Sequence, residues 1–252
     1  MLNNVVIIGK GKVGEATAQT LSTDVSFYDP LKGLTVRNFH KYDLTIVCVD
    51  TLRESPDDHK TVDSVLGMLS AIKYQGIVAI RSTVSPSYIE RIEDEYNLNI
   101  VMFPEFMRQT DDLKMDTPWI VVLGGLPQHT KQLEEFLFAN NYYQDPSLAH
   151  HVSAKEAAII KLCQNAGLAT KVIFYNMVNE ICEKYNVDYN NVRVGVGADT
   201  RVGIQYSIVP SPDDNQKGFK GHCLPKDVLC LANIETHGFF SKLLEINKQL
   251  GR

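Results

Sequence analysis

The chain has 252 residues, which is enough for one large domain or two modest ones with a packed core. Its apolar fraction of 44% and charged fraction of 22% are typical of a soluble globular protein. The formal net charge of −5 argues against nucleic acid as a partner, since sequence-independent binding requires a basic surface. No apolar run reaches the roughly 18 residues of a membrane-spanning helix, so we expect no membrane contact.

The first residues pass directly into an apolar strand without a cleavage-type signal, which favours a cytoplasmic location. The cysteine count is odd and no CxxC pair occurs, so we expect neither a disulfide framework nor a metal site. The five cysteines are Cys48, Cys163, Cys182, Cys223 and Cys230.

Over residues 1–150, short runs rich in Val and Ile alternate with polar segments of helical length. This pattern predicts an α/β fold, a Rossmann-type doubly wound parallel sheet built from βαβ units. Residues 50–55 and 111–118 are predicted loops at the carboxyl edge of the sheet, where ligands bind in such folds. The predicted strands are Val5–Ile8, Val25–Tyr28, Leu44–Val49, Gly76–Ile80, Asn99–Met102 and Trp119–Leu123, and 127–140 is a predicted helix.

The pattern changes near residue 150, where Ser153 and Glu156 form a capping box. Only Gly167 interrupts the helical pattern from there to Tyr185, and a helix of this length would measure roughly 50 Å. Residues 151–252 are therefore predicted as a long connecting helix and a small all-α domain. Its expected parts are a helix stop at Asn186, a short helix over 188–197, a loop over 198–222 and a helical pair over 225–250.

Gly9-Lys10-Gly11-Lys12-Val13-Gly14 follows the first predicted strand and opens a helix. In a GxGxxG turn the first glycine permits the tight turn, the second admits a pyrophosphate, and the third lets the helix pack on the strand. Asp29 ends the second strand, where a carboxylate bonds the ribose of a dinucleotide, and the following Pro30 favours NAD over NADP although Lys32 is close. The predicted NAD contacts are Gly9, Gly11, Lys12, Val13, Gly14, Asp29, Thr51, Thr83 and Lys226.

Cys223 lies in the glycine-rich segment 218–227, with Lys226 and Asp227 three and four positions later. A thiol becomes a useful nucleophile when its pKa, about 8.5 unperturbed, is lowered by positive charge or a helix N-terminus. Pro225 suits the first turn of a helix, which would place Cys223 near the positive end of that helix. The alternative is a surface loop that happens to contain a cysteine.

Three further positions are candidates for catalysis. Lys161 and Asn165 share a face of the long helix, where they could stabilise a developing oxyanion, and the alternative is a solvated helix face. Glu105 follows the fifth strand as a candidate general base, and Thr83 follows the fourth strand, where it could position a water. For both of these the alternative is loop capping.

Taken in this order, the motifs resemble those of the UDP-glucose/GDP-mannose dehydrogenase family. The resemblance implies a two-step, four-electron oxidation of the primary alcohol of a nucleotide sugar to a carboxylate, with two NAD consumed. The matching segments are the fingerprint 9–14, Ser82-Thr83-Val84, Pro104-Glu105-Phe106, 161–166, 168–171, 199–203 and Gly221-His222-Cys223-Leu224-Pro225-Lys226-Asp227.

The resemblance also implies roles for individual residues. Cys223 would add to the intermediate aldehyde as a thiohemiacetal, which is oxidised to a thioester and hydrolysed. Lys161 and Asn165 would stabilise the alkoxide and oxyanion, Asp227 would orient or activate water, Glu105 would act as base in hydrolysis, and Thr83 would hold a water. Arg201 would contact the substrate from a neighbouring subunit. The implied substrate contacts are Glu105, Phe106, Met107, Lys161, Asn165, Arg201 and Gly221.

The chain departs from the family pattern in three places. Family members are usually much longer, with a second Rossmann-like domain that covers the nucleotide, and this chain stops at Arg252, about where that domain would begin. Lys220 stands where the family has a glycine, so either the loop has shifted or Lys220 supplies a phosphate contact. Gln109 stands where the family often has a second glutamate.

Two functional hypotheses follow. The first is an NAD-dependent dehydrogenase of nucleotide sugars, most simply UDP-sugars, and the second is a non-catalytic NAD- or nucleotide-binding module. A small helical domain has little core of its own, so we also predict a homodimer through this domain. The apolar residues for that contact are Val172, Ile173, Tyr175, Met177 and Ile181, and the alternative is that they pack inside one subunit.

Overall fold

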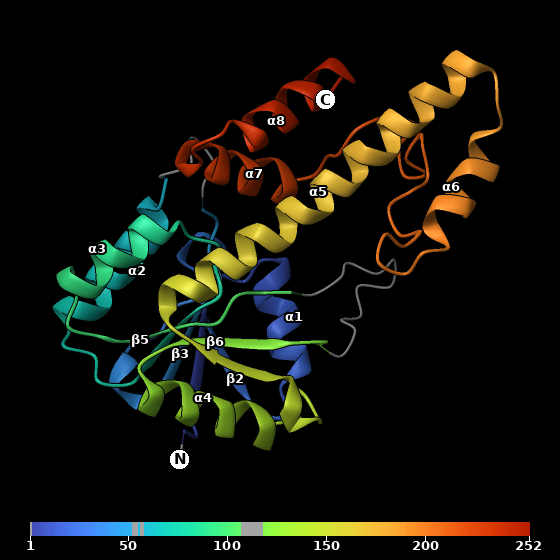
Figure 1. Ribbon diagram of the computed structural model, residues 1–252. Helices are drawn as coiled ribbons and strands as arrows, with labels where there is room; N and C mark the ends of the chain where they lie inside the picture. The colour runs from blue at the N-terminus through green and yellow to red at the C-terminus, as the bar shows by residue number, and fades with distance from the viewer. Residues whose placement is uncertain (1, 52–54, 56–57, 107–117) are drawn as a thin grey trace. The chain divides into compact units, whose positions relative to one another are not determined.

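The computed structural model describes residues 2–51, 55, 58–106 and 118–252. The chain divides into two compact units, a first unit of residues 1–161 and a second unit of residues 162–252. The long helix α5, Ala154–Tyr185, belongs to both units, because the division falls inside it (Figure 1). The functions assigned to residues 1–150 and 151–252 stay predictions.

The first unit contains a seven-stranded sheet in the order β2-β1-β3-β4-β5-β6-β7. Neighbouring strands are parallel except β5 and β6, which are antiparallel. This sheet confirms the predicted Rossmann-type α/β fold, and its strand order reverses between β1 and β3. The strands are β1 (Val5–Ile8), β2 (Val25–Tyr28), β3 (Leu44–Val47), β4 (Ile77–Ile80), β5 (Asn99–Met102), β6 (Val121–Gly125) and β7 (Ala149–Val152).

Helices cover both faces of this sheet (Figure 1). Alternate residues of β1 enter different cores, because successive side chains of a strand point to opposite faces. Val6 and Ile8 pack with α2 (Lys60–Ala71) and α3 (Pro86–Glu95), whereas Val5 and Ile7 pack with α1 (Lys12–Thr20) and α4 (Pro127–Ala139). With both faces covered, the edges where the strands end are the places left for polar chemistry.

Several boundaries differ from the predicted ones. Strand β3 ends two residues early, at Val47, and β6 begins at Val121 rather than at Trp119. Trp119 instead donates a hydrogen bond from Nε1 to the Phe106 carbonyl, at 3.2 Å. Strand β7, which pairs in parallel with β6, was not predicted from the sequence. The described residues of this unit also form short 3-10 helices, η1 (Pro30–Lys32), η2 (Phe39–Lys41) and η3 (Pro146–Leu148).

The second unit contains the later part of α5 together with α6 (Tyr189–Gly197), α7 (Cys223–Ile234) and α8 (Phe239–Gln249). Helix α5 ends before Asn186, which has the left-handed φ of 52° expected of a helix stop. Val228 and Leu231 of α7 and Leu243 of α8 are buried, and these two helices pack against each other. The predicted helical segments of this part of the chain are confirmed, with α7 starting at Cys223 itself.

By length and composition, α5 alone among the described helices could cross a membrane. The buried core helix of a soluble protein passes the same test, and 44% of the apolar window of α5 is buried. The predicted absence of a membrane contact stays a prediction.

Two residues expected at a dimer contact are buried within their own chain. Ile173 is 4% exposed and Tyr175 is fully buried, with its hydroxyl donating to the Gly203 carbonyl at 2.8 Å. Their assignment to a dimer surface is therefore wrong, and for them the alternative of packing inside one subunit holds. On the same helix Phe174, Ile181 and Tyr185 are exposed.

The predicted capping box at the start of α5 is present. The Ser153 amide donates to the Glu156 carboxylate at 2.7 Å, and the Glu156 amide donates to the Ser153 hydroxyl at 3.3 Å. The bonds from the Ser153 amide and hydroxyl hold the pKa of Glu156 below its usual value. Two otherwise unpaired helix-terminal donors are satisfied in this way.

We predict that Ser153→Ala lowers the free energy of unfolding by about 1 kcal/mol, the usual cost of losing a helix N-cap. The measurement is urea denaturation followed by far-UV circular dichroism. Ser64→Ala is the matched control, because Ser64 lies in α2 and its hydroxyl only donates to the Lys60 carbonyl one turn back. A control effect as large as that of Ser153→Ala would contradict the capping role.

Candidate functional site

The fingerprint turn after β1 is built around its glycines. Gly9 has a φ of 95°, and a Cβ there would lie 2.4 Å from the Cys48 carbonyl oxygen. A Cβ on Gly14 would lie 2.1 Å from the Gly9 carbonyl oxygen, so both positions require glycine. A Cβ on Gly11 would meet open space instead. The turn therefore fits a dinucleotide, since a pyrophosphate can approach at Gly11 where α1 begins.

Asp29 lies against this turn. Its carboxylate accepts a hydrogen bond from the Lys10 amide at 3.0 Å, and the Lys32 amine donates to the Lys10 carbonyl. These bonds join the end of β2 to the fingerprint, which is where the ribose of a dinucleotide is read in this fold.

The loops after β3 and β4 are joined at the carboxyl edge of the sheet. The Thr51 hydroxyl donates to the Thr83 carbonyl at 2.5 Å, and the Val49 amide donates to the Ser82 hydroxyl at 2.9 Å. The structure thus brings Thr51 and Thr83 together, next to the point where the strand order reverses. In open α/β sheets that point is the ligand crevice.

Arg81 is a buried cation at the same edge to which the sequence analysis assigned no role. Its guanidinium donates to the Tyr142 hydroxyl at 3.1 Å and lies 4.2 Å from the centre of the Phe103 ring. Burial alone would lower the pKa of Arg81, but Tyr142, Cys48 and Glu105 favour its positive charge and the pKa is raised. The signal in the sequence was a charged residue directly after a fully buried strand.

Lys161 lies near the start of α5 and is 9% exposed. Its ammonium lies 5.2 Å from the centre of the Phe106 ring, a cation–π contact within the first unit. Glu105 is half-buried beside Phe106. Met107 and Gln109 lie outside the described residues.

Asn165 and Asp227 are bonded to each other within the second unit. The Asn165 amide donates to one oxygen of the Asp227 carboxylate at 2.5 Å, and Lys226 donates to the other oxygen at 2.9 Å. Asp227 is fully buried and Asn165 is 5% exposed. A buried carboxylate requires such donors. The bond from Asn165 fixes the first turn of α7 against α5, and the bond from Lys226 pairs the second oxygen within α7.

Cys223 is the first residue of α7, one helical turn before Asp227, and its side chain is exposed. The helix dipole favours a negative charge at this end. Burial raises the pKa of Cys48 to about 12. Partial desolvation by neighbouring atoms also raises the pKa of Cys163, although its side chain reaches solvent. The Cys163 side chain is exposed on α5, whereas Cys182 and Cys230 are buried.

The loop before Cys223 accommodates Lys220 without backbone strain. The left-handed conformations fall on Gly218, with φ of 80°, and Gly221, with φ of 88°. The Lys220 amine pairs with Asp214 at 2.8 Å. Hydrogen bonds from Arg252 and from Lys220 hold the pKa of Asp214 well below its usual range.

Arg201 lies at the surface of the second unit, with 88% of its side chain exposed. Its guanidinium donates to both carboxylate oxygens of Asp199, at 2.6 and 3.0 Å for the shortest contact to each. This pairing raises the pKa of Arg201 and holds the side chain where a second molecule can reach it.

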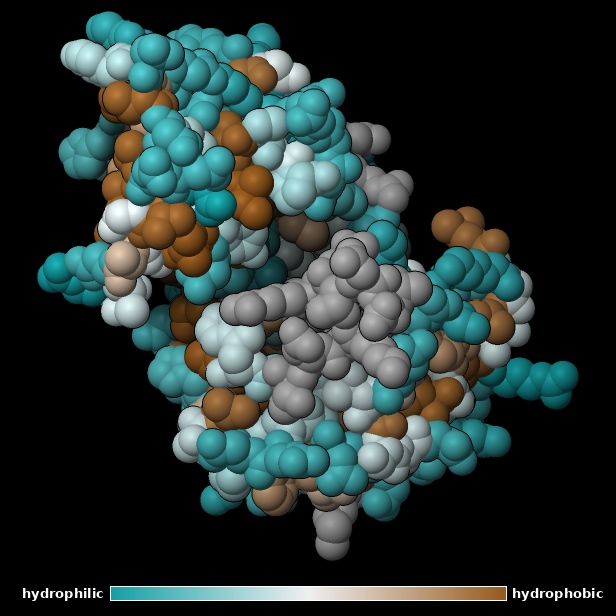
Figure 2. All heavy atoms as spheres, turned by 90° about the vertical axis from the view of Figure 1, so that its right-hand side faces the viewer, coloured by the Kyte–Doolittle hydropathy of each residue, from teal (hydrophilic) through white to brown (hydrophobic). Residues whose placement is uncertain are grey.

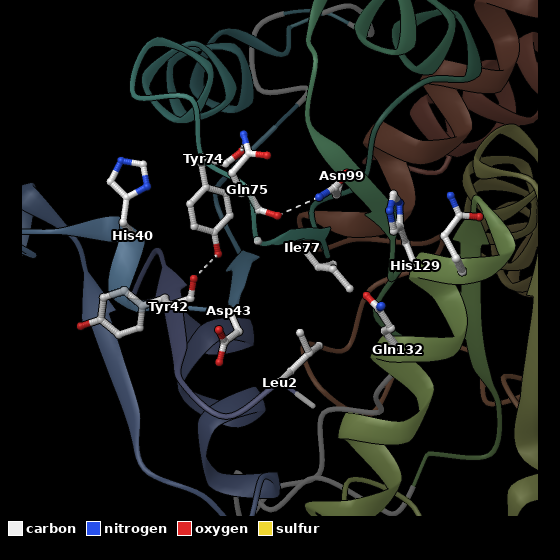
Figure 3. A pocket seen from close by; sticks show the side chains of 12 residues that line it. Leu2, His40, Tyr42, Asp43, Tyr74, Gln75, Ile77, Asn99, His129 and Gln132 are labelled. Atoms are coloured by element: carbon white, nitrogen blue, oxygen red, sulfur yellow. Dashed lines mark hydrogen bonds between the residues drawn. The ribbon is translucent and has the colours of Figure 1, made fainter.

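The described residues form three cavities that residues 9–14 of the fingerprint do not line. One of about 460 Å³ opens at the amino edge of the sheet, where Asp43, Asn99 and His129 point into it (Figure 3). The described residues that line it include no lysine or arginine, so it does not fit a phosphate. Another, of about 360 Å³, lies in the second unit between α5 and the loop before Cys223, and Lys220 lines it.

Among the described residues no three His, Cys, Asp or Glu side chains gather as a metal site would require. The predicted absence of a metal stays a prediction.

The match to a known protein family covers most of the second unit. Residues 155–250 match the central domain of the UDP-glucose/GDP-mannose dehydrogenase family. The UDP-glucose 6-dehydrogenase of Campylobacter jejuni is 30% identical over 172 residues, which is 68% of this chain and 42% of that protein. The enzyme of the same name from Rickettsia prowazekii is 26% identical over 253 residues, which is 97% of this chain and 56% of that protein.

A solved structure also has this fold. A UDP-glucose dehydrogenase from Pyrobaculum islandicum superposes with a TM-score of 0.76 at 21% identity, covering 99% of this chain and 68% of that one. The chain spans about half the length of the curated relatives it matches.

We predict that Asp227→Ala lowers the free energy of unfolding by about 3 kcal/mol, because it leaves the Lys226 ammonium and the Asn165 amide without their buried acceptor. Urea denaturation measures the change. Asp213→Ala is the control, since the Asp213 side chain is 74% exposed and 4.0 Å from Lys220. The control should stay within about 0.5 kcal/mol of the wild type. Equal effects would contradict a structural role for the buried carboxylate.

Proposed function

We propose, on the premise that this chain belongs to the UDP-glucose/GDP-mannose dehydrogenase family, that it oxidises the primary alcohol of a nucleotide sugar to a carboxylate. The substrate class that fits the family is a UDP-sugar. The observation that carries the proposal is the buried bond between Asn165 and Asp227, beside the exposed thiol of Cys223 at the start of α7.

The dinucleotide would be held by the fingerprint and by the loops that follow β3 and β4 at the carboxyl edge. NAD, when bound there, supplies the hydride acceptor for the oxidation of the alcohol. The glycine geometry and the position of Asp29 against the turn support this assignment. The residues proposed to hold NAD are Gly9, Gly11, Lys12, Val13, Gly14, Asp29, Thr51, Thr83 and Lys226.

Cys223 would form the covalent intermediates. Its thiolate adds to the carbonyl carbon of the aldehyde, and the oxygen takes up a proton, giving a thiohemiacetal. Loss of a hydride from that carbon to a second NAD, with loss of the hydroxyl proton, would give a thioester. Water then adds to the thioester, and the thiolate leaves as the carboxylate forms. The exposed thiol and its place at a helix N-terminus support this role.

Asn165 would stabilise the oxyanion that develops at the reacting carbon. One hydrogen of its amide donates to Asp227, and this bond fixes the direction of the second hydrogen. Lys161, one helical turn earlier on α5, would add a positive charge. Asp227 is fully buried and holds two donors, so its arrangement favours orienting Asn165 over activating water. Glu105 remains the proposed base for hydrolysis, with Thr83 holding a water.

A second candidate is a module that binds NAD without turnover. It would require only the fingerprint turn and Asp29 against it. In either case the sugar would contact Phe106, Met107, Gly221 and, from a neighbouring subunit, Arg201. A cytoplasmic location fits both candidates.

We also propose a homodimer through the second unit. Phe174, Ile181 and Tyr185 are spaced by seven and four residues, so they share one face of α5, and all three are exposed. Helix α6 has no buried residue, and hydrophobic side chains gather on the side of the molecule shown in Figure 2. A second copy covering this face would remove it from water.

The first test concerns turnover. The purified protein is mixed with NAD and each of a panel of nucleotide sugars, and the absorbance of reduced NAD is followed. Two reduced NAD molecules should form for each molecule of the sugar that is the substrate. Cys223→Ser should lower the rate by about 10³-fold or more, because the hydroxyl is a far weaker nucleophile.

The control for this test is Cys163→Ser, since Cys163 is also exposed but lies on α5. It should keep the rate within about two-fold of the wild type. Binding of NAD without turnover on any nucleotide sugar would contradict the enzyme and support the binding module.

The second test concerns assembly, measured by light scattering after size exclusion. The wild type should show twice the 28.3 kDa mass of one chain. Ile181→Glu should give single chains, because it places a charge in the proposed apolar contact. Leu31→Glu is the control, since Leu31 is 99% exposed in the first unit. A monomeric wild type would refute the dimer.

A further inference from the structure

The segment before Cys223 is held by a side chain from a distant part of the second unit. Asn247, on α8, accepts a hydrogen bond from the Phe219 amide at 2.8 Å and donates one to the Phe219 carbonyl at 3.0 Å. Asn247 is 6% exposed and Phe219 is 2% exposed. A single amide thus pairs both backbone groups of a residue four positions before the thiol.

A second buried asparagine supports the neighbouring residue. Asn176, on α5, accepts a hydrogen bond from the Gly218 amide at 3.1 Å and donates to the Val172 carbonyl at 2.8 Å. Gly218 has a φ of 80°, and a Cβ on it would lie 2.5 Å from the side-chain Oδ1 of Asn247. The backbone at 218 and 219 is therefore shaped to fit against Asn247.

These bonds limit where the helix with the thiol can begin. Downstream of Cys223, α7 is fixed by its packing on α8 and by the bond of Asp227 to Asn165. Upstream, the backbone is fixed at Phe219, so only residues 220–222 lie between this fixed residue and the start of α7. The position of the thiol at the first turn of α7 depends on both.

We propose that Asn247 is a positioning residue for Cys223. It acts through the backbone of Phe219 and keeps the sulfur at the N-terminus of α7, where the thiolate is stabilised. This inference rests on the proposed role of Cys223 as a nucleophile. The amide group is required because the backbone of Phe219 offers one donor and one acceptor. A carboxylate at 247 could accept from the amide, but its second oxygen would lie against the Phe219 carbonyl oxygen, where no hydrogen bond can form.

The test is the rate of alkylation by iodoacetamide, measured for each cysteine by peptide mass spectrometry over a range of pH. The exposed Cys163 on α5 is the internal reference. In the wild type, the Cys223 rate should reach half its maximum about one pH unit or more below 8.5. In Asn247→Asp the midpoint should rise towards 8.5, and the rate at pH 7 relative to Cys163 should fall about five-fold or more.

Two further variants separate positioning from stability. Gly218→Ala disturbs the contact between Asn247 and the backbone at 218 and 219 from the loop side. It should therefore shift the pH profile of Cys223 alkylation in the same direction, and it serves as the test of positioning if Asn247→Asp does not fold. Leu243→Ala removes a buried side chain from the same helix but leaves the Asn247 amide in place, so it should leave the profile of the folded protein unchanged.

An unchanged Cys223 profile in the folded Asn247→Asp and Gly218→Ala proteins would overturn the proposal, as would an equal shift in Leu243→Ala. If the wild-type midpoint is itself near 8.5, the nucleophile role fails and the positioning role fails with it. An early wild-type midpoint that the variants do not move would overturn only the positioning role.

Discussion

The hydrogen bond between Asn165 and Asp227 is the constraint on which the chemistry of the second unit depends. It joins residues 62 positions apart, the middle of α5 and the first turn of α7, and both partners are buried. A buried carboxylate without donors would be costly, so the bond from Asn165 determines how α7 meets α5, while Lys226 satisfies the other carboxylate oxygen from within α7. The position of Cys223 follows, because it begins the same helix one turn earlier.

The fold of the first unit was largely predictable because it follows from side-chain periodicity. Successive residues of β1 enter different cores, Val6 and Ile8 one and Val5 and Ile7 the other. A strand that is buried on both faces has a continuous apolar sequence. The sequence pattern therefore located six strands with errors of at most two residues at each end. It missed β7, because His150 and His151 of this edge strand are exposed and carry no apolar signal.

The candidate site was predictable to the extent that its residues follow regular elements. Glycines of the fingerprint and the threonines after β3 and β4 lie where strand ends must converge, so their proximity follows from topology. Arg81 was missed because its partner Tyr142 is 61 residues away and belongs to no motif. Lys220 seemed to require strain, but the left-handed conformations fall on the glycines on either side of it.

The second unit shows why hydropathy alone does not determine what a helix is for. By length and composition α5 could cross a membrane, yet it carries Asn165 and Asn176, each buried and each bonded to a different segment of the second unit. Each amide offers a donor and an acceptor, so its partners must present matching groups at a fixed distance. These pairs span 62 and 42 residues, and no local pattern encodes them. Apolar spacing therefore forms the helix, and its few buried amides determine which loop lies against it.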